Sequence, residues 1–227
     1  MVDHNNHTRI SSSKSAPGEE GRAVKASLSI ESRMGRTVKG EAINLLFGNQ
    51  MLIGRERSCD LFLDDDRISR KHSLLRIDPD AARLSDLGST NGTTRNDEPV
   101  SEEIIIESGD LICFGHARTY EAKIVAREDA ITSLRLASGA DAYLLVPQEI
   151  IIGFADPKAT DVDFRVYDPK ILPRHARIEY FAGRAFIVTL DPSRPVVVNG
   201  NPVREIEIRN NYLIEIGGTL LRFERPD

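Results

Sequence analysis

The sequence contains no tryptophan, and aromatic residues make up only 6% of it. A large ligand cleft lined by aromatic side chains is therefore not expected. The sequence also has no surplus of positive charge, since 30 Lys and Arg stand against 35 Asp and Glu, for a formal net charge of −5. This acidic balance argues against a nucleic-acid backbone as the main partner.

Cysteine is nearly absent too. Cys59 and Cys113 each lie in an apolar, strand-like run, and no CxxC pair occurs. We predict two buried free thiols in a reducing compartment and exclude a disulfide scaffold.

Long hydrophobic runs are also missing. No run approaches 18 apolar residues, so no membrane span is predicted. Residues 1–23 are polar, lack periodicity and contain no apolar segment typical of a signal peptide. We expect residues 1–23 to form a disordered tail and the protein to be cytoplasmic.

Short alternating runs dominate the rest of the chain. The stretch "VKASLSIE" (24–31) alternates with a period of two, and similar runs follow, separated by Gly, Asn, Asp and Pro. Many short strands with turn residues every 8–12 positions predict an all-β sandwich or barrel. A chain of 227 residues has room for two such domains of about 100 residues each.

The pattern restarts near residue 130. Its landmarks recur in the same order at offsets of 99 to 103: Gly54 and Gly153, His72 and His175, Pro99-Val100 and Pro202-Val203, Gly115 and Gly217. This spacing predicts two copies of one β domain, at 24–126 and 127–227. The join "AREDA" (126–130) is short and lacks Gly and Pro, so the copies are expected to sit close together.

Three elements of the first copy follow predicted strands: Gly54-Arg55, Ser69-Arg70-Lys71-His72 and Ser89-Thr90-Asn91-Gly92. Loops at one end of a sandwich often carry binding residues because the sheets hold them rigidly. Arg55 and Arg70 offer forked, permanently charged donors suited to phosphate, and Ser69 adds a hydroxyl. The Asn91 amide sits in a turn where it can meet a peptide backbone. Together these residues predict an anion pocket beside a peptide-binding turn.

The order of these motifs resembles the forkhead-associated (FHA) domain, a phosphothreonine-binding module. The segments "LIGRERSCDLFLDDDRISRKHSLL", "DLGSTNGT" and "SGDLICFG" carry the resemblance, which covers about residues 24–126. It implies a β sandwich of about 11 strands that binds phosphothreonine proteins in a Ser/Thr-kinase pathway.

The resemblance also implies roles for single residues. Arg55 and Ser69 would bind the phosphate, and Arg70 would contact the phosphopeptide. Thr90 and Asn91 match the third motif, in which the Asn holds the peptide backbone. Four residues would serve the scaffold of the motifs: Gly54, His72, Gly92 and His175.

Plainer interpretations exist for each motif. Arg55 could be a surface arginine, Ser69 a turn residue and His72 a satisfied structural histidine. Asp64-Asp65-Asp66 does not have the spacing of an EF-hand loop, so a solvated turn is expected there. Ser69 is not set in a GxSxG elbow. No catalytic residue, metal or cofactor is expected, so an enzyme is disfavoured.

The second copy has lost the phosphate donors. Phe154 replaces Arg55, and Leu172-Pro173 replaces Ser69-Arg70. Residues 192–195 read "PSRP" in place of the Asn-Gly motif, while His175 remains. The second copy is therefore predicted to be structural or protein-interacting, although nearby arginines leave a weak anion site open.

Two functions follow from this sequence. The leading one is an adaptor that binds phosphothreonine peptides through the first copy. The alternative is a phosphorylation-independent scaffold subunit of a larger assembly. Thr8, in the predicted tail, could occupy the first copy's pocket if it were phosphorylated.

Overall fold

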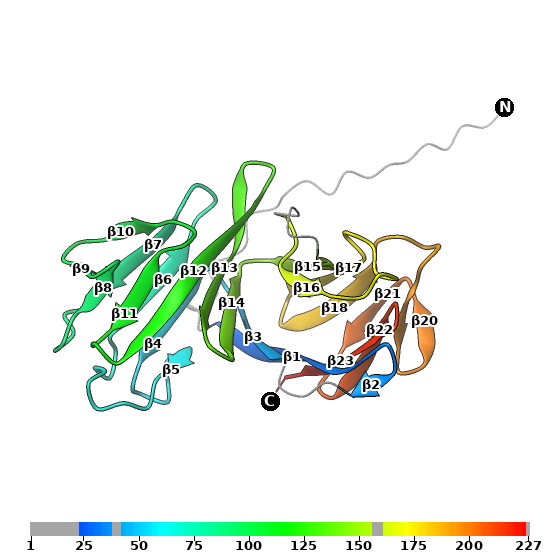
Figure 1. The fold of residues 1–227 in the computed structure, drawn as a ribbon, viewed down its shortest axis with the longest axis horizontal. Coiled ribbons are helices and arrows are strands. Elements are labelled where there is room, and N and C mark those ends of the chain that lie inside the picture. Colours follow the sequence, from blue (N-terminus) through cyan, green and yellow to red (C-terminus); the bar gives the residue numbers. More distant parts are fainter. Residues whose placement is uncertain (1–22, 38–41, 156–160, 226–227) are drawn as a thin grey trace.

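The computed structural model describes residues 23–37, 42–155 and 161–225, and within them it contains 23 strands and no helix. The all-β prediction is confirmed, with two β sandwiches side by side (Figure 1). Among the described residues there is thus no helix that could cross a membrane. The predicted tail, including Thr8, lies outside the described residues except for Ala23.

Each copy supplies 11 main strands, the number that the resemblance implies. A short strand, β2 (Arg36–Thr37), adds to the edge of β1. The main strands of the first copy are β1 (Val24–Arg33), β3 (Ala42–Phe47), β4 (Gln50–Gly54), β5 (Leu61–Phe62), β6 (Ser73–Ile77), β7 (Ala82–Asp86), β8 (Thr93–Arg95), β9 (Glu98–Pro99), β10 (Ile104–Ile106), β11 (Leu111–Phe114) and β12 (Arg118–Arg127).

The second copy follows the same order. Its strands are β13 (Ala130–Ser138), β14 (Asp141–Val146), β15 (Glu149–Phe154), β16 (Phe164–Val166), β17 (Ala176–Phe181), β18 (Arg184–Thr189), β19 (Val196–Val198), β20 (Asn201–Val203), β21 (Glu205–Ile208), β22 (Tyr212–Ile216) and β23 (Thr219–Glu224).

One sheet of 13 strands runs through both sandwiches, in the order β20-β19-β22-β23-β1-β3-β14-β13-β12-β11-β8-β9, with β2 beside β1. A sheet of β10-β7-β6-β4-β5 covers one end of it, and a sheet of β16-β15-β17-β18-β21 covers the other. The two cores lie on opposite faces of the long sheet. On β14, Tyr143 and Leu145 contact the first core, whereas the alternate residues Leu144 and Val146 belong to the second.

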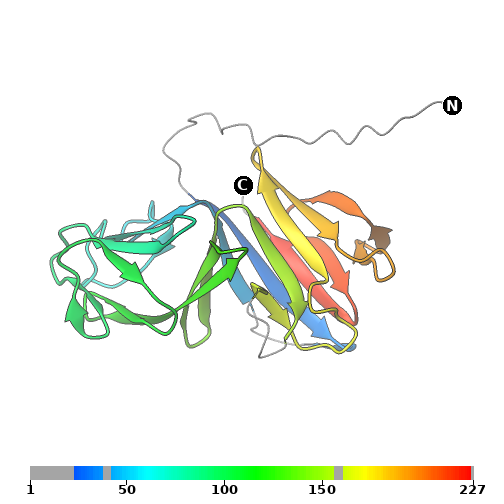
Figure 2. The same cartoon turned by 90° about the horizontal axis from the view of Figure 1, so that it is seen from above.

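The copies exchange their first hairpins. β1 pairs with β23, and β13 pairs with β12. Leu28 and Ile30 of β1 are therefore buried in the second core, and Leu134 and Leu136 of β13 are buried in the first. Figure 2 shows the blue strand β1 beside the red strand β23. The hydrophobic cores thus do not divide at residues 126 and 127, where the sequence repeat does.

The turn between β12 and β13 explains this exchange. Glu128 and Asp129 both have positive φ, at 52° and 63°. A two-residue turn with both φ values positive matches the twist of a hairpin, so the strand that follows pairs antiparallel with the one before it. The predicted join is therefore the tip of a hairpin in the first sandwich, and the copies are held close together as expected.

A buried polar cluster lies where the sandwiches meet. The Arg127 Nη1 is 2.7 Å from the Asp163 Oδ2, and the Ile151 N–H donates to the same oxygen at 2.7 Å. The Ser133 hydroxyl donates to the other carboxylate oxygen. The side chain of Asp163 is 0% exposed and that of Arg127 is 9% exposed. This cluster joins β12 and β13 to the segment before β16.

Both cysteines are free thiols, as predicted, but only Cys59 is buried. Cys113 is half-buried, because its neighbours Ile112 and Phe114 face the core and the alternation of β11 turns Cys113 away from it.

Candidate functional site

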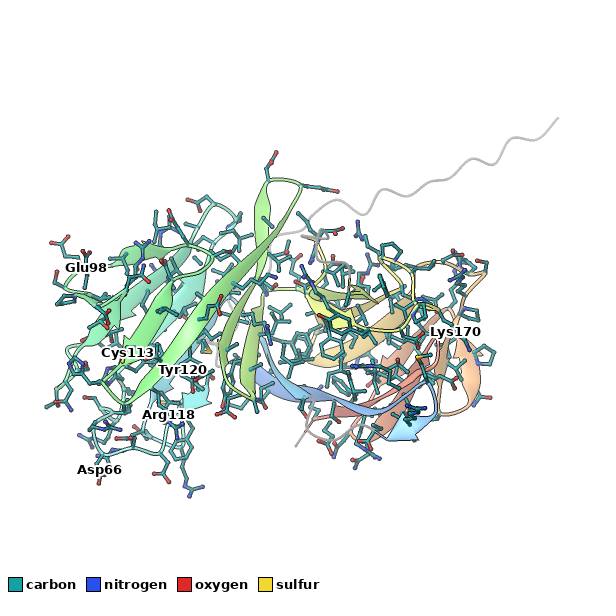
Figure 3. The ribbon with its side chains drawn as sticks, viewed as in Figure 1. Asp66, Glu98, Cys113, Arg118, Tyr120 and Lys170 are labelled. Atoms are coloured by element: carbon teal, nitrogen blue, oxygen red, sulfur yellow. The ribbon has the colours of Figure 1, made fainter. Side chains whose placement is uncertain are left out.

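The loops after β4, before β6 and before β8 meet at one end of the first sandwich, near Asp66 in Figure 3. They enclose an open cavity of about 650 Å³. Its lining residues are Arg55, Glu56, Asp66, Arg67, Ile68, Ser69, Arg70, Lys71, Thr90 and Asn91. All five residues predicted to bind phosphopeptide are among them.

Gly54 lets the first two loops approach each other. The Arg55 N–H donates to the Ser69 carbonyl and the Glu56 N–H donates to the Arg70 carbonyl, both at 3.0 Å. A Cβ atom on Gly54 would lie only 2.2 Å from the Arg70 oxygen. Only glycine fits at position 54. The close contact between the two loops that it permits fixes the positions of Arg55 and Ser69.

Arg55 lines the cavity and is held by two other lining residues. Its Nε donates to the Ile68 carbonyl at 3.2 Å, and its Nη1 lies 3.5 Å from the Asp66 carboxylate. The Arg55 side chain is 42% exposed and that of Asp66 is fully exposed, so this ion pair is weak and solvent-screened. An anionic ligand can replace Asp66 as the partner of Arg55 at little energetic cost.

Ser69 connects the second loop to the third. The Thr90 N–H donates to the Ser69 Oγ at 3.0 Å, and the Ser69 hydroxyl lies 3.4 Å from the Thr90 Oγ1. Two hydroxyls and a backbone amide therefore converge beside Arg55.

His72 is fully buried and links the same loops from below. The Ser69 N–H donates to its Nδ1 at 3.0 Å, so the ring carries its proton on Nε2, which donates to the Gly92 carbonyl at 3.0 Å. The bonds position the loops, and the ring does not line the cavity.

Asn91 is engaged within the protein. Its Nδ2 donates to the Arg67 carbonyl at 2.8 Å, which ties the third loop to the second. Gly92, with φ of 72°, follows it in the left-handed region that glycine favours. The Asn91 side chain is exposed at the rim, where its carbonyl oxygen can still accept a hydrogen bond.

Sequence reasoning missed two cations of the cavity, Arg67 and Lys71. Arg67 donates three hydrogen bonds to the Asp65 carboxylate, two from its guanidinium and one from its backbone N–H. These bonds lower the pKa of Asp65 to about 2. Arg70 and Lys71 are exposed and have no ion pair within the described ranges. The run of basic residues after Ser69 in the sequence could have indicated that Lys71 belongs to the cavity. The Asp64–Asp66 turn, predicted to be merely solvated, supplies partners for Arg55 and Arg67.

Asp86 orders the loop that carries Thr90 and Asn91. Burial raises the pKa of its carboxyl, but hydrogen bonds from the Thr93 hydroxyl and from the hydroxyl and N–H of Ser89 outweigh this effect and leave the pKa lowered.

A lowered folded-state pKa gives a stabilisation that is complete above the unfolded pKa of about 4 and is lost as the pH falls through the folded pKa. We therefore expect Asp86→Asn to lower the free energy of unfolding by about 1.5–3 kcal/mol at neutral pH, and by less at pH 3. Urea denaturation at both pH values measures this difference. The exposed Asp64→Asn is the control, and equal losses at both pH values for Asp86→Asn would contradict the assignment.

The second copy keeps the backbone frame of this site without its donors. The Phe154 N–H donates to the Leu172 carbonyl at 2.8 Å, as Arg55 does to Ser69. The Leu172 N–H donates to His175 Nδ1 at 3.2 Å, as Ser69 does to His72. His175 Nε2, however, has no hydrogen-bond partner among the described residues, and burial lowers the pKa of the ring. The second domain therefore lacks a counterpart of the bond from His72 to the Gly92 carbonyl, and Pro195 stands at the position of Gly92.

The FHA-domain family model matches residues 51–115 and 150–217, more than half of the chain. The chain belongs to the FHA family. FHA proteins are phosphothreonine-binding adaptors in Ser/Thr-kinase signalling, and both copies found by the repeat are FHA domains. The matched ranges leave out β1 to β3, β12 to β14 and β23, which include all four strands of the exchanged hairpins.

Two mycobacterial relatives are among the similar proteins. FHA domain-containing protein FhaA of Mycobacterium tuberculosis is 44% identical over 66 residues, which are 29% of this chain and 12% of that protein. The glycogen accumulation regulator GarA of the same species is 38% identical over 65 residues, 29% of this chain and 40% of that protein. The chain thus spans less than half the length of each relative.

A solved structure of the FhaA FHA domain, complexed with the intracellular domain of Rv3910, is 37% identical to this chain. It covers 40% of this chain and 92% of that one, with a TM-score of 0.29.

Proposed function

We propose that this protein is a non-enzymatic adaptor that binds phosphothreonine-containing proteins through its first FHA domain, within a Ser/Thr-kinase pathway. The observation that carries the proposal is the cavity in which Arg55, Ser69 and Arg70 converge with Thr90 and Asn91. In the second FHA domain, Phe154, Leu172 and Pro173 stand at the positions of Arg55, Ser69 and Arg70. Ser193 and Arg194 stand at those of Thr90 and Asn91.

The chemistry of the cavity suits a phosphate group. A phosphothreonine carries nearly two negative charges at neutral pH and three acceptor oxygens. Arg55 and Arg70 supply charge-assisted donors, and the hydroxyls of Ser69 and Thr90 supply further ones. The exposed Asn91 at the rim can accept from the backbone of the bound peptide. The first domain alone therefore discriminates phosphorylated from unphosphorylated threonine in this proposal.

Binding to a phosphothreonine peptide library tests the proposal. Arg55→Ala should weaken the best peptide by about 2–5 kcal/mol, roughly 30-fold or more in Kd, because a charged donor to the phosphate is lost. Ser69→Ala should weaken it as well, since the mutation removes a hydroxyl and frees the Thr90 N–H.

The matched control is Leu172→Ala, the same loop position in the second domain, which should bind like the unmodified protein. Equal affinity for phosphorylated and unphosphorylated peptides would refute the proposal and favour the phosphorylation-independent scaffold.

A further inference from the structure

A second cavity, which we call the junction cleft, lies between β12, β13 and β16. Its volume is about 420 Å³. Lys123 and Arg135 come from the long sheet and Arg165 comes from β16, while Ile43, Leu144 and Phe164 are among its apolar residues. The cleft exists because the hairpin exchange places β12 and β13 next to the second sandwich (Figure 1). It is separate from the loops that carry the FHA motifs in the first domain and from the matching loops of the second.

Two like charges face each other in this cleft. Lys123 on β12 and Arg135 on β13 are direct cross-strand partners. Like charges in directly opposed positions destabilise an antiparallel pair. Within the described residues, no ion pair neutralises either side chain. Such a pair is unfavourable for folding alone, and a ligand of opposite charge would relieve the repulsion.

The surrounding charges leave the cleft positive. Burial lowers the pKa of Lys123, and Arg165 and Arg135 lower it further, whereas Glu121 has the opposite effect. Among the described residues that line the cleft, Asp163 is the one carboxylate, and it is already held by Arg127 and Ser133. An anionic group entering the cleft therefore meets a positive potential with an apolar floor.

The strand at the edge of the cleft suits an extended chain. β16 is the outermost strand of its sheet and pairs only with β15 among the described strands. Extended peptides bind to such edges through main-chain hydrogen bonds, with alternate side chains entering neighbouring pockets. The protein's net negative charge argues against a nucleic acid as the ligand.

We propose that the junction cleft binds an acidic peptide segment of a partner protein, extended along β16 with its carboxylates on Lys123 and Arg135. This site goes beyond phosphothreonine recognition. It needs no phosphorylation, and strands of both FHA domains build it.

Fluorescence anisotropy with the full chain tests the proposal. The probe is a fluorescein-labelled, unphosphorylated peptide of alternating Glu and Ser, and the comparison peptide has Gln in place of Glu. We expect the Glu peptide to bind and the Gln peptide not to bind. Lys123→Gln combined with Arg135→Gln should weaken binding by about tenfold or more, because two charged contacts are lost.

The matched control variant loses the same two positive charges as Lys123→Gln combined with Arg135→Gln, but at sites away from the cleft. Arg184→Gln combined with Arg209→Gln removes two exposed arginines that pair with Glu207 near the opposite edge of the sheet that contains β16. This variant should bind the Glu peptide almost as the unmodified chain does. Equal losses in the two double variants, or no binding to the unmodified chain, would overturn the proposal. Displacement of the probe by inorganic phosphate at constant ionic strength would also overturn it, by making the cleft a small-anion site.

Two further readouts separate a binding role from a structural one. The double variant Lys123→Gln and Arg135→Gln should bind phosphothreonine peptides normally, so this site and the first-domain cavity can fail independently. Lys123→Gln alone should raise the melting temperature of the free protein, because it removes the repulsion from Arg135. A lowered melting temperature would give Lys123 a structural role and overturn the argument from charge.

Discussion

Replacing Asp163 by alanine is expected to lower the free energy of unfolding by about 3–5 kcal/mol, because it removes the closest and fully buried partner of the Arg127 charge. Only the more distant Glu149 carboxylate, at 3.8 Å, then remains beside Arg127. The lost carboxylate also accepts hydrogen bonds from the Ile151 N–H and the Ser133 hydroxyl. Urea denaturation followed by circular dichroism measures the loss. Since the cluster lies between the sandwiches, both should unfold at a lower urea concentration.

The matched control is Asp161→Ala. Asp161 also contacts Arg127, but through its backbone carbonyl at 3.3 Å, and its carboxylate lies 3.8 Å from the half-exposed Arg174. This substitution should cost less than about 1 kcal/mol. Similar losses for Asp161→Ala and Asp163→Ala would contradict the importance of the buried pair. Replacing Arg127 by Met together with Asp163 by Leu should recover much of the stability, because no buried charge then remains unpaired.

Gly54→Ala is expected to weaken phosphopeptide binding by about 100-fold, the scale of effect that a misplacement of 1 Å can have at a positioned site. Its Cβ atom would lie 2.2 Å from the Arg70 carbonyl oxygen, so the loop with Ser69 and Arg70 must move away from Arg55. Overpacking of this kind also costs about 1–3 kcal/mol of stability. Isothermal titration with the best phosphothreonine peptide, well below the melting temperature, measures the affinity.

Gly153→Ala provides the same steric conflict in the second domain, where the Cβ atom would lie 1.8 Å from the Pro173 oxygen. It should lower stability about as much as Gly54→Ala does but leave phosphopeptide affinity unchanged. Equal effects of the two substitutions on affinity would mean that Gly54 acts through overall stability and not through the position of the loops.

The motifs and the repeat could be read from the sequence because they depend on local chemistry. Any chain that folds in this way keeps the spacing of three features. They are a glycine where two loops come close, a serine and a histidine three residues apart, and an Asn-Gly turn. The sequence therefore predicts which loops meet and where the second copy lacks donors. It does not predict that the Asn91 amide is bonded to the Arg67 carbonyl, because this contact depends on how two distant loops pack.

The hairpin exchange could not be predicted from alternation. Leu28 and Ile30 in β1 and Leu134 and Leu136 in β13 follow the same period of two, so either strand could complete either core. The deciding feature is the turn at Glu128 and Asp129, which adopts positive φ without a glycine to announce it. The junction cleft was missed for the same reason, since it forms only when β12 and β13 pair.

The exchange also joins the two FHA domains thermodynamically. Each core is closed by strands from the other domain, so neither can unfold without exposing apolar side chains of its neighbour. A ligand that binds only the folded state stabilises it by RT ln(1 + [L]/Kd), and in a chain that unfolds as one unit this gain extends to every strand. A phosphopeptide held by loops of the first domain would then protect the second domain from unfolding. Under the proposed function, the second domain would serve as half of the framework that keeps the loops of the first domain in place.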